Sequence, residues 1–499
     1  MVPPIASIVV ALGLALVVLG AKWSLIEHYA GPGPFGDQWK AEVEELYLPA
    51  VVGEFDWRVL FKPHNEHRIV LTRLLDCVLF RLGGNRHDPK LQMVVDALLH
   101  AVFFGVVAVW LTRSGSQQAI LPTVVLLVVL GVAPVSYENT LWGFQSQVYF
   151  VLLFWLGALW GMNEHDFPSW RWFAGLVCGV CAVLSFGPGS LVGGAMLVGA
   201  IVEWKRRCPI SSVTGANVAA GLVLLTMGVM LRVHVEKHDL LHAPDFWTFL
   251  QSGIRLAGWP VEFIGPVGIV LWIPSFVLLL QLLGGRCPWT RQVKIAVSFV
   301  ALAAAVIGAT SLMRGQVVVS DGIAPRYCDI LAFGVIGNFV ALDAVLRNGK
   351  VAGRRSIVFL FCWLFLAVVG LGAHGLHNFR TVLPFWRASL EEQATRIRAF
   401  VEEPDRFSIL EGRGLWEIGY PDPERLARIL SCESVETVLP IEVIGTENGS
   451  ELSTAGILAR GAMTRGTPVT MLGGVLLVVG LSANRRFWRN RRNVADRIE

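Results

Sequence analysis

Residues 36–68 read GDQWKAEVEELYLPAVVGEFDWRVLFKPHNEHR. This stretch is rich in carboxylates and histidines, it follows the first strongly apolar run, and the sequence after it is mostly apolar. Over its 499 residues the chain is 54% hydrophobic and 16% charged, whereas soluble domains carry about 25% charged residues. The composition predicts an all-α polytopic membrane protein. A polar loop beside a membrane span is costly to keep unless it has a function.

The apolar runs predict how often the chain crosses the membrane. A helix needs about 20 apolar residues to span a bilayer. Twelve runs are candidates: 5–26, 91–111, 120–135, 148–160, 172–186, 191–204, 213–233, 261–283, 293–313, 328–346, 357–376 and 467–483. The first run has no basic segment before it and no A-x-A cleavage site, so we expect an uncleaved anchor instead of a signal peptide.

Two helices are expected to lie at the membrane surface. The segment Ile69–Leu82 is too short to span, and it carries Arg73 and Asp76, which favours an amphipathic interfacial helix. The segment Gln38–Leu48 has the same pattern, and Pro49 is expected to end it. These two helices would flank the histidine-rich turn within an active-site loop, residues 27–68.

Basic clusters predict the orientation of the chain. Clusters lie at Arg113, 205–207, 286–294, 347–355 and 485–492, and all fall on one side if the N-terminus is on that side. By the positive-inside rule this side is the cytoplasm, so every large polar segment would be extracytoplasmic. A net charge of +4, with arginines beside apolar runs, argues against nucleic-acid binding.

The sequence suggests three units: a transmembrane module over 1–376, a small extracytoplasmic domain over 377–466, and a final span with a basic cytoplasmic tail over 467–499. In the middle unit, Asp422-Pro423-Glu424 is typical of a helix start. The stretch VETVLPIEVIG, residues 435–445, is expected to form a strand. We therefore predict a small α/β segment that docks on the membrane module, because it is too small for a large core of its own.

Asp37 follows a Gly-Pro-Gly-Pro turn and precedes a predicted helix, so an ordinary helix cap would explain it as well as catalysis would. A wider pattern favours catalysis. The chain has one anchor span, an acidic residue early in the next loop, two interfacial helices, then Pro-His-Asn-Glu-His-Arg and a second span. Much later comes Ala-Pro-Arg-Tyr, residues 324–327.

This order resembles the membrane glycosyltransferases of the GT-C superfamily, which includes protein O-mannosyltransferases, the aminoarabinose transferase of lipid A and arabinofuranosyltransferases. The resemblance implies a bacterial cytoplasmic (inner) membrane enzyme that takes sugar from a polyprenyl-phosphate donor. The acceptor would be an extracytoplasmic glycan, lipid or protein. The chain departs from the family in two ways: Asp37 stands alone instead of in a paired-acid motif, and the soluble C-terminal part is short.

The chemistry of such a transfer needs a base for the acceptor hydroxyl and a cation for the departing phosphate. Asp37 is the candidate base, and attack opposite the phosphate would invert the anomeric centre. Arg326 with Tyr327 is the candidate phosphate site, since a guanidinium fork matches phosphate oxygens. Arg314 is a weaker candidate of the same kind. In the 136–147 loop, the candidate substrate-binding residues are Glu138 and Gln145.

The densest polar cluster comprises His64, Asn65, Glu66, His67 and Arg68. Acceptor or donor-phosphate binding is the favoured role for these five residues. A divalent metal held by His64 and His67 stays open, although H-x-x-H alone is a weak signal. No other cofactor is expected. His234, His238 and His242 would share one face if they lay on a helix.

Two other classes of protein compete with a glycosyltransferase. A twelve-span secondary transporter would show two similar halves, and residues 1–210 and 211–499 show no repeat. A lipid or glycan flippase, or a partner of one, is the other alternative, which the polar loop disfavours. The sugar, the acceptor, the length of the lipid and the oligomeric state do not follow from the sequence.

Overall fold

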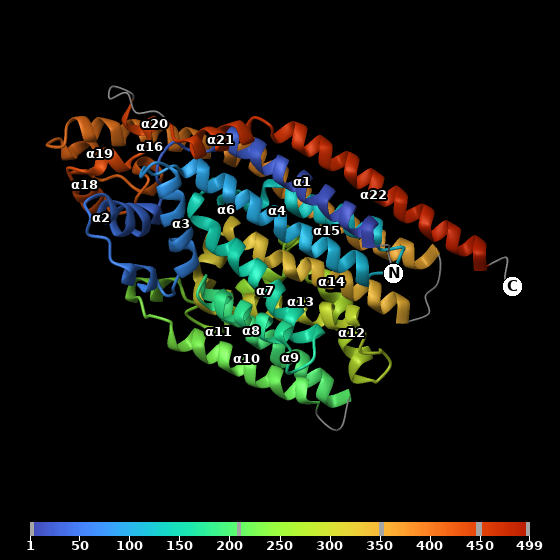
Figure 1. The fold of residues 1–499 in the computed structure, drawn as a ribbon. Helices are drawn as coiled ribbons and strands as arrows, with labels where there is room; N and C mark the ends of the chain where they lie inside the picture. The colour runs from blue at the N-terminus through green and yellow to red at the C-terminus, as the bar shows by residue number, and fades with distance from the viewer. Residues whose placement is uncertain (1–3, 207–210, 349–353, 446–451, 496–499) are drawn as a thin grey trace.

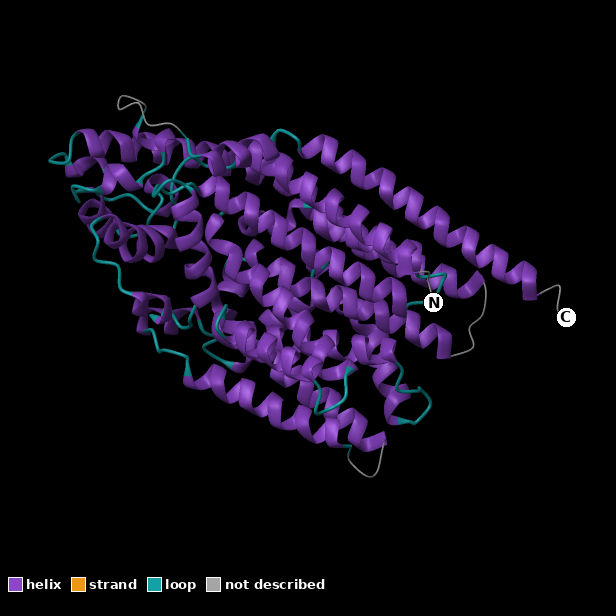
Figure 2. Cartoon of the chain, in the orientation of Figure 1, coloured by secondary structure: helices purple, strands orange, loops and turns teal. Residues whose placement is uncertain are grey.

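The structure is a computed structural model that describes residues 4–206, 211–348, 354–445 and 452–495. Within these residues the chain forms helices and loops, and no β-strand (Figure 2). An all-α polytopic protein is therefore confirmed, and the predicted α/β character of the C-terminal segment is wrong.

Ten stretches in the described part of the chain are long and apolar enough to cross a membrane. They are Ile5–Tyr29, Pro89–Ser114, Ile120–Leu141, Gly143–Glu164, Ser212–Met230, Glu262–Leu283, Arg291–Ser320, Pro325–Asn348, Arg355–Glu402 and Gly466–Arg485. Two further predicted spans form α8 (Trp170–Val183), of 14 residues, and α9 (Leu191–Arg206), of 16 residues. Both fall short of about 20 residues, so twelve spans remain a prediction.

The remaining long helices are α1 (Pro4–Tyr29), α4 (Pro89–Ser114), α5 (Ile120–Val132), α7 (Ser146–Glu164), α10 (Ser212–Met230), α11 (Phe246–Gly258), α12 (Ile273–Leu283), α13 (Arg291–Ser320), α14 (Cys328–Asn348), α15 (Arg354–His377), α16 (Leu383–Glu402) and α22 (Gly466–Ala495). Shorter helices are α2 (Leu48–Val51), α3 (Val70–Leu82), α6 (Tyr137–Leu141), α17 (Leu415–Ile418), α18 (Pro423–Leu430), α19 (Val435–Val438), α20 (Ile441–Ile444) and α21 (Thr454–Met463).

Two π-helical segments are η1 (Trp39–Tyr47) and η9 (Asn378–Val382). The 3₁₀ turns are η2 (Trp57–Phe61), η3 (Pro134–Ser136), η4 (Gly143–Gln145), η5 (Gly187–Ser190), η6 (Glu236–Leu241), η7 (Glu262–Trp272), η8 (Pro325–Tyr327) and η10 (Phe407–Ile409).

The bundle has two distinct ends (Figure 1). The short helices α2, α3 and α18 to α21 gather at one end, which we call the loop end. At the other, basic end, α1 begins and α22 finishes. Contacts tie the ends of α4, α13 and α14 together there: Arg347 donates to the Ser114 carbonyl oxygen, and Gln292 donates to Asp343 at 2.6 Å. The sequence segments that flank the long helices with basic residues, such as Arg291 and Arg347, thus lie at this end, and the short helices lie at the other.

Small residues bring the first and last long helices into close contact. Along the seam between α1 and α22, a Cβ placed at Gly20 would overlap the Gly466 carbonyl oxygen, and one at Gly473 would overlap that of Gly13. Close backbone approach of this kind is how helices associate in membranes, where apolar side chains gain little by leaving lipid. The seam fixes the last helix directly beside the anchor.

Large aromatic side chains fill the centre of the bundle. Phe333 on α14 packs against Phe299 of α13 with ring centroids 4.8 Å apart, and against Phe103 of α4 at 5.7 Å. Trp155 and Trp110 extend the group, and all five side chains are buried. We call this set the aromatic layer. It lies between Asp329, one turn earlier on α14, and Asp343 near the basic end.

The segment 377–466 packs on the loop end. Helix α15 continues through η9 into α16 up to Glu402, so the predicted boundary at residue 376 lies inside a continuous helical stretch. Ile397 and Leu426 of the segment share one apolar cluster with Trp39 and Val43 of η1 and with Phe80 of α3. The segment and the loop after the anchor therefore form one packed unit.

Two local predictions fail for physical reasons. Residues 435–445 form α19 and α20 in place of a strand, because the buried positions Val435, Val438, Leu439 and Val443 recur with helical spacing. Pro49 does not end the helix before it. It occupies the first turn of α2, where a missing N–H costs nothing, and the chain stays helical to Val51. The start of α18 is as predicted, with the Asp422 carboxylate accepting from the Arg425 amide at 2.9 Å.

Candidate active site

A tight turn presents Asp37. Gly36 has φ of +57°, a left-handed conformation that glycine adopts without strain, and a Cβ there would meet the Trp142 ring at 2.9 Å. The Gly36 amide donates to the Gly419 carbonyl oxygen at 2.7 Å, and the Trp142 indole donates to the Phe35 carbonyl oxygen at 2.9 Å. Contacts from two distant segments therefore hold the backbone beside Asp37.

The Asp37 carboxylate faces His64, with Oδ2 lying 3.4 Å from Nε2, while 41% of the Asp37 side chain stays exposed. Burial opposes ionisation of Asp37. The hydrogen bond and charge of His64, followed by the charge of Arg326, outweigh this effect and lower the pKa of Asp37 below its usual value. Asp37 is thus an ionised, reachable carboxylate, as a general base must be.

The histidine turn is held by its own backbone. The amides of His64 and His67 each donate to the other's carbonyl oxygen, at 2.8 and 3.1 Å, and Asn65 takes a left-handed φ of +48° between them. The Asn65 amide nitrogen lies 3.0 Å from His64 Nε2. His67 Nε2 lies 3.5 Å from the Gln147 side-chain oxygen, and burial lowers the pKa of His67 to about 4. His67 is therefore neutral at pH 7.

Arg326 reaches the same region from the other half of the chain. Its guanidinium donates to Glu138 Oε2 at 3.1 Å and lies 5.6 Å from the centre of the Tyr327 ring. The Arg326 side chain is 41% exposed, whereas Glu138 is largely covered. Asp37 contacts His64 directly, whereas the charge of Arg326 acts on the Asp37 carboxylate without a direct contact. Glu138 contacts Arg326 and no contact links it directly to Asp37.

Glu66 points to a second cationic group. Arg314 donates to its Oε1 at 2.9 Å, Arg232 to its Oε2 at 3.3 Å, and His238 Nδ1 lies 2.6 Å from Oε1. Burial opposes ionisation of Glu66, but the hydrogen bond and charge of Arg314 prevail and lower its pKa. Arg314, predicted as a weaker phosphate-binding candidate, thus contacts the histidine turn through Glu66.

The other predicted residues have supporting positions. Arg68 donates to the Phe61 carbonyl oxygen and closes the loop before α3, while Gln145 is buried behind Trp142. His234, His238 and His242 do not share a helix face, because η6 is a short 3₁₀ turn and only His238 reaches Glu66. No group of three or more metal-ligating side chains able to hold an ion occurs in the described ranges.

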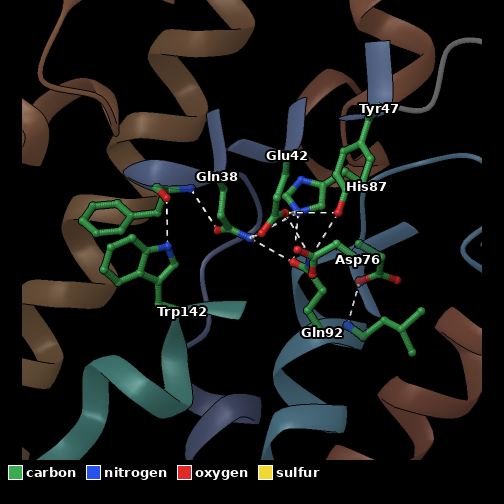
Figure 3. Close-up of polar contacts among 10 residues, drawn as sticks. Gln38, Glu42, Tyr47, Asp76, His87, Gln92 and Trp142 are labelled. Atoms are coloured by element: carbon green, nitrogen blue, oxygen red, sulfur yellow. Dashed lines mark hydrogen bonds and ion pairs between the residues drawn. The ribbon is translucent and has the colours of Figure 1, made fainter. Parts of the chain in front are cut away.

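A buried polar network behind Asp37 was not predicted (Figure 3). Gln38 donates to Gln92 at 2.9 Å and to Glu42 at 3.2 Å, and Gln92 donates in turn to Glu42 at 3.0 Å and to Asp76 at 3.1 Å. His87 Nε2 lies 3.2 Å from Glu42. Burial and the nearby charge of Glu42 raise the pKa of Asp76 well above its usual value. This network joins η1, α3 and α4 and anchors the residue that follows Asp37.

Sequence signals for this network exist but are weak. Arg73 and Asp76 were predicted to face the membrane surface, yet both are buried, while Leu74, Val78 and Leu82 on the same helix are exposed. The polar face of α3 therefore points inward. On α4, Gln92, Asp96 and His100 recur every four residues within an apolar run, a spacing that places them on one helix face.

Comparison of the chain with protein-family models, with curated proteins and with solved structures finds no match. The function therefore has to be argued from the site itself.

Proposed function

We propose that this protein transfers a sugar from a polyprenyl-phosphate donor to an acceptor outside the cytoplasmic membrane. The observation that carries the proposal is the exposed Asp37 carboxylate in contact with His64 at the loop end of the bundle, where the charge of Arg326 also acts on it. A base and a phosphate-matching cation are the two groups that such a transfer requires.

The reaction would proceed as a single displacement. Asp37 accepts the proton of the acceptor hydroxyl while the acceptor oxygen bonds to the anomeric carbon. The bond from that carbon to the phosphate oxygen breaks, and its electron pair leaves with the lipid phosphate. Arg326 would stabilise the charge that develops there, since a guanidinium offers several donors and only part of its fork is taken by Glu138. Attack opposite the leaving group inverts the anomeric centre.

The surface of the bundle has an apolar groove that would accommodate the hydrocarbon chain of a lipid-linked donor. An apolar groove of about 610 Å³ lies between α9, α12 and α13, lined on α13 by residues from Ala296 to Ala305. Arg314 is nine residues further along the same helix, roughly 13 Å toward the loop end. A chain in the groove and a phosphate near the arginines would match a lipid phosphate in both chemistry and direction.

The orientation follows from the basic side chains. Arg113, Arg291 and Arg347 flank the ends of the long helices α4, α13 and α14 opposite Asp37, and the positive-inside rule assigns the end with such span-flanking basic residues to the cytoplasm. The site would face outward, where a lipid-linked sugar is the activated donor available.

The test is transfer of radiolabelled sugar from a panel of polyprenyl-phosphate sugars by membranes containing the wild type, Asp37→Asn or Asp56→Asn. Asp56 is an exposed aspartate of the same loop that caps η2, and asparagine caps equally well, so it is the matched control. Loss of the base is expected to reduce kcat by about 10²-fold or more in Asp37→Asn, with Asp56→Asn near the wild type.

Equal turnover in the two variants would remove Asp37 as the base. If the wild type transfers no sugar from any donor in the panel, the result favours a transporter or flippase instead. One observation favours that alternative: ionisable side chains lie buried among the membrane-spanning helices, as in proton-coupled carriers.

A further inference from the structure

The membrane-spanning helices enclose a second polar group, separate from the network of Figure 3. It comprises Lys22 of α1, His100 of α4, Asn139 and Thr140 of α6, and Asp329 of α14, and every one of these side chains is buried. We call it the Lys22–Asp329 cluster. Charged side chains at this depth are expensive and are retained where they serve a function.

The cluster is connected by direct contacts. Lys22 Nζ donates to Thr140 Oγ1 at 2.9 Å, and the neighbouring Asn139 amide donates to Asp329 Oδ2 at 2.9 Å. His100 Nε2 lies 3.5 Å from the other oxygen of Asp329. Lys22 and Asp329 are also within electrostatic range of one another. Lys22 and Asp329 thus contact two consecutive residues of α6, Thr140 and Asn139.

The same asparagine reaches the candidate active site. Besides contacting Asp329, the Asn139 amide donates to the carbonyl oxygen of Arg326 at 3.1 Å. Glu138, the residue before Asn139, accepts from the Arg326 guanidinium. The short helix α6 thus contacts Arg326 through backbone and side chain at once, and Asp329 sets the position of the asparagine.

We propose that Asp329 is a positioning residue that holds Arg326 in place through Asn139. Asp329 does not touch substrate in this scheme. The importance of Arg326 for phosphate departure rests on the proposed function, whereas the positioning of Arg326 does not.

The substitution Asp329→Asn keeps the shape of the side chain and removes its charge. One of the contacts to Asn139 or His100 is then lost. Asp343→Asn is the matched control. Asp343 is a buried aspartate on the same helix that accepts from the Ser116 amide at 2.9 Å and from Gln292, but it lies near the basic end.

The experiment measures two quantities in each purified full-length variant. The first is the rate at which phenylglyoxal modifies Arg326, read from the peptide containing it by mass spectrometry. The second is sugar transfer, with kcat and KM for the donor determined separately. Release of Arg326 from Glu138 should raise its modification rate about threefold or more in Asp329→Asn. Transfer should lose about 10-fold in kcat with little change in KM, since the aligned cation acts on the departing phosphate.

An unchanged modification rate in Asp329→Asn, or the same increase in Asp343→Asn, would overturn the proposal even in a protein that transfers no sugar. A normal modification rate combined with slow transfer would also contradict it, because the defect would then lie elsewhere.

Discussion

Neighbouring residues set the direction and the ionisation of the Asp37 carboxylate. Gly36 gives the backbone a turn that a side chain at that position would strain, and Trp142 packs against the turn, so the carboxylate direction is set before any substrate arrives. His64 then favours the ionised form of Asp37. The sequence pointed to both residues, but their pairing could not be predicted, because 26 intervening residues fold into η1, α2 and η2 between them.

The role of His64 predicts a change in pH dependence. In His64→Gln the contribution of His64 to lowering the pKa of Asp37 is lost, so that pKa should rise. Since the base must be ionised, the acid limb of kcat/KM should then begin at a higher pH than in the wild type. The measurement is kcat/KM for transfer between about pH 3 and 8, a range that brackets ordinary carboxyl pKa values. His234→Gln, at an exposed histidine, is the control, and coincident acid limbs in all three proteins would contradict the role.

For individual elements, the sequence pattern predicted the secondary structure correctly where the apolar residues of a helix lay on one face. The run that became α3 was expected to be helical, and it is. The predicted surroundings of its polar face are wrong, because this face is buried. Arg73 donates to Glu45 at 2.6 Å and Asp76 accepts from Gln92. These partners lie on other elements, so periodicity within α3 could not distinguish a face toward water from a face toward a buried network. The predicted strand at residues 435–445 is wrong because residue type and burial pattern disagree there. The β-branched residues suggested a strand, although the buried positions follow helical spacing.

Glu66 links the histidine turn to α13 and to the segment before η6, and this link predicts a pH-dependent loss of stability. Glu66→Gln should lower the stability at pH 7 by about 2 kcal/mol, as for loss of a charged hydrogen bond. The pKa of Glu66 is lowered on folding, so its contribution is complete above the ordinary carboxyl pKa and is lost as the pH falls through the folded-state value. Thermal unfolding in detergent from pH 7 down to about pH 3 measures this.

In that experiment the variant and the wild type should converge at the acid end. Glu54→Gln, in the exposed part of the same loop, should match the wild type throughout. A constant gap between Glu66→Gln and wild type at every pH would show that the contacts of Glu66 stabilise the fold independently of its charge.

For the whole molecule, hydropathy was sufficient to predict a helical membrane bundle. It could not predict which buried polar groups would meet, because Lys22, His100 and Asp329 come from three apolar runs far apart in the chain. Nor could it show that residues 377–466 share an apolar cluster with η1 and α3. Both features depend on which helices become neighbours, and that information is spread over the full sequence.

The proposed orientation can be checked with one native cysteine. Cys432 is exposed at the loop end, so a membrane-impermeant maleimide should label it in intact cells, and Cys432→Ser should abolish that signal. In a Cys432→Ser background, Arg286→Cys at the basic end should be labelled only after the cells are permeabilised. The opposite labelling pattern would invert the topology and place Asp37 in the cytoplasm.

The aromatic layer bears on whether the proposed reaction is coupled to the proton-motive force. Phe103, Phe299 and Phe333 separate the Lys22–Asp329 cluster from the polar contacts of Asp343. In the proposed transfer, the proton taken up by Asp37 would be released on the side of the layer that supplied it. Such a turnover would move no net charge between compartments, so we expect transfer at the same rate on an energised and on a depolarised membrane.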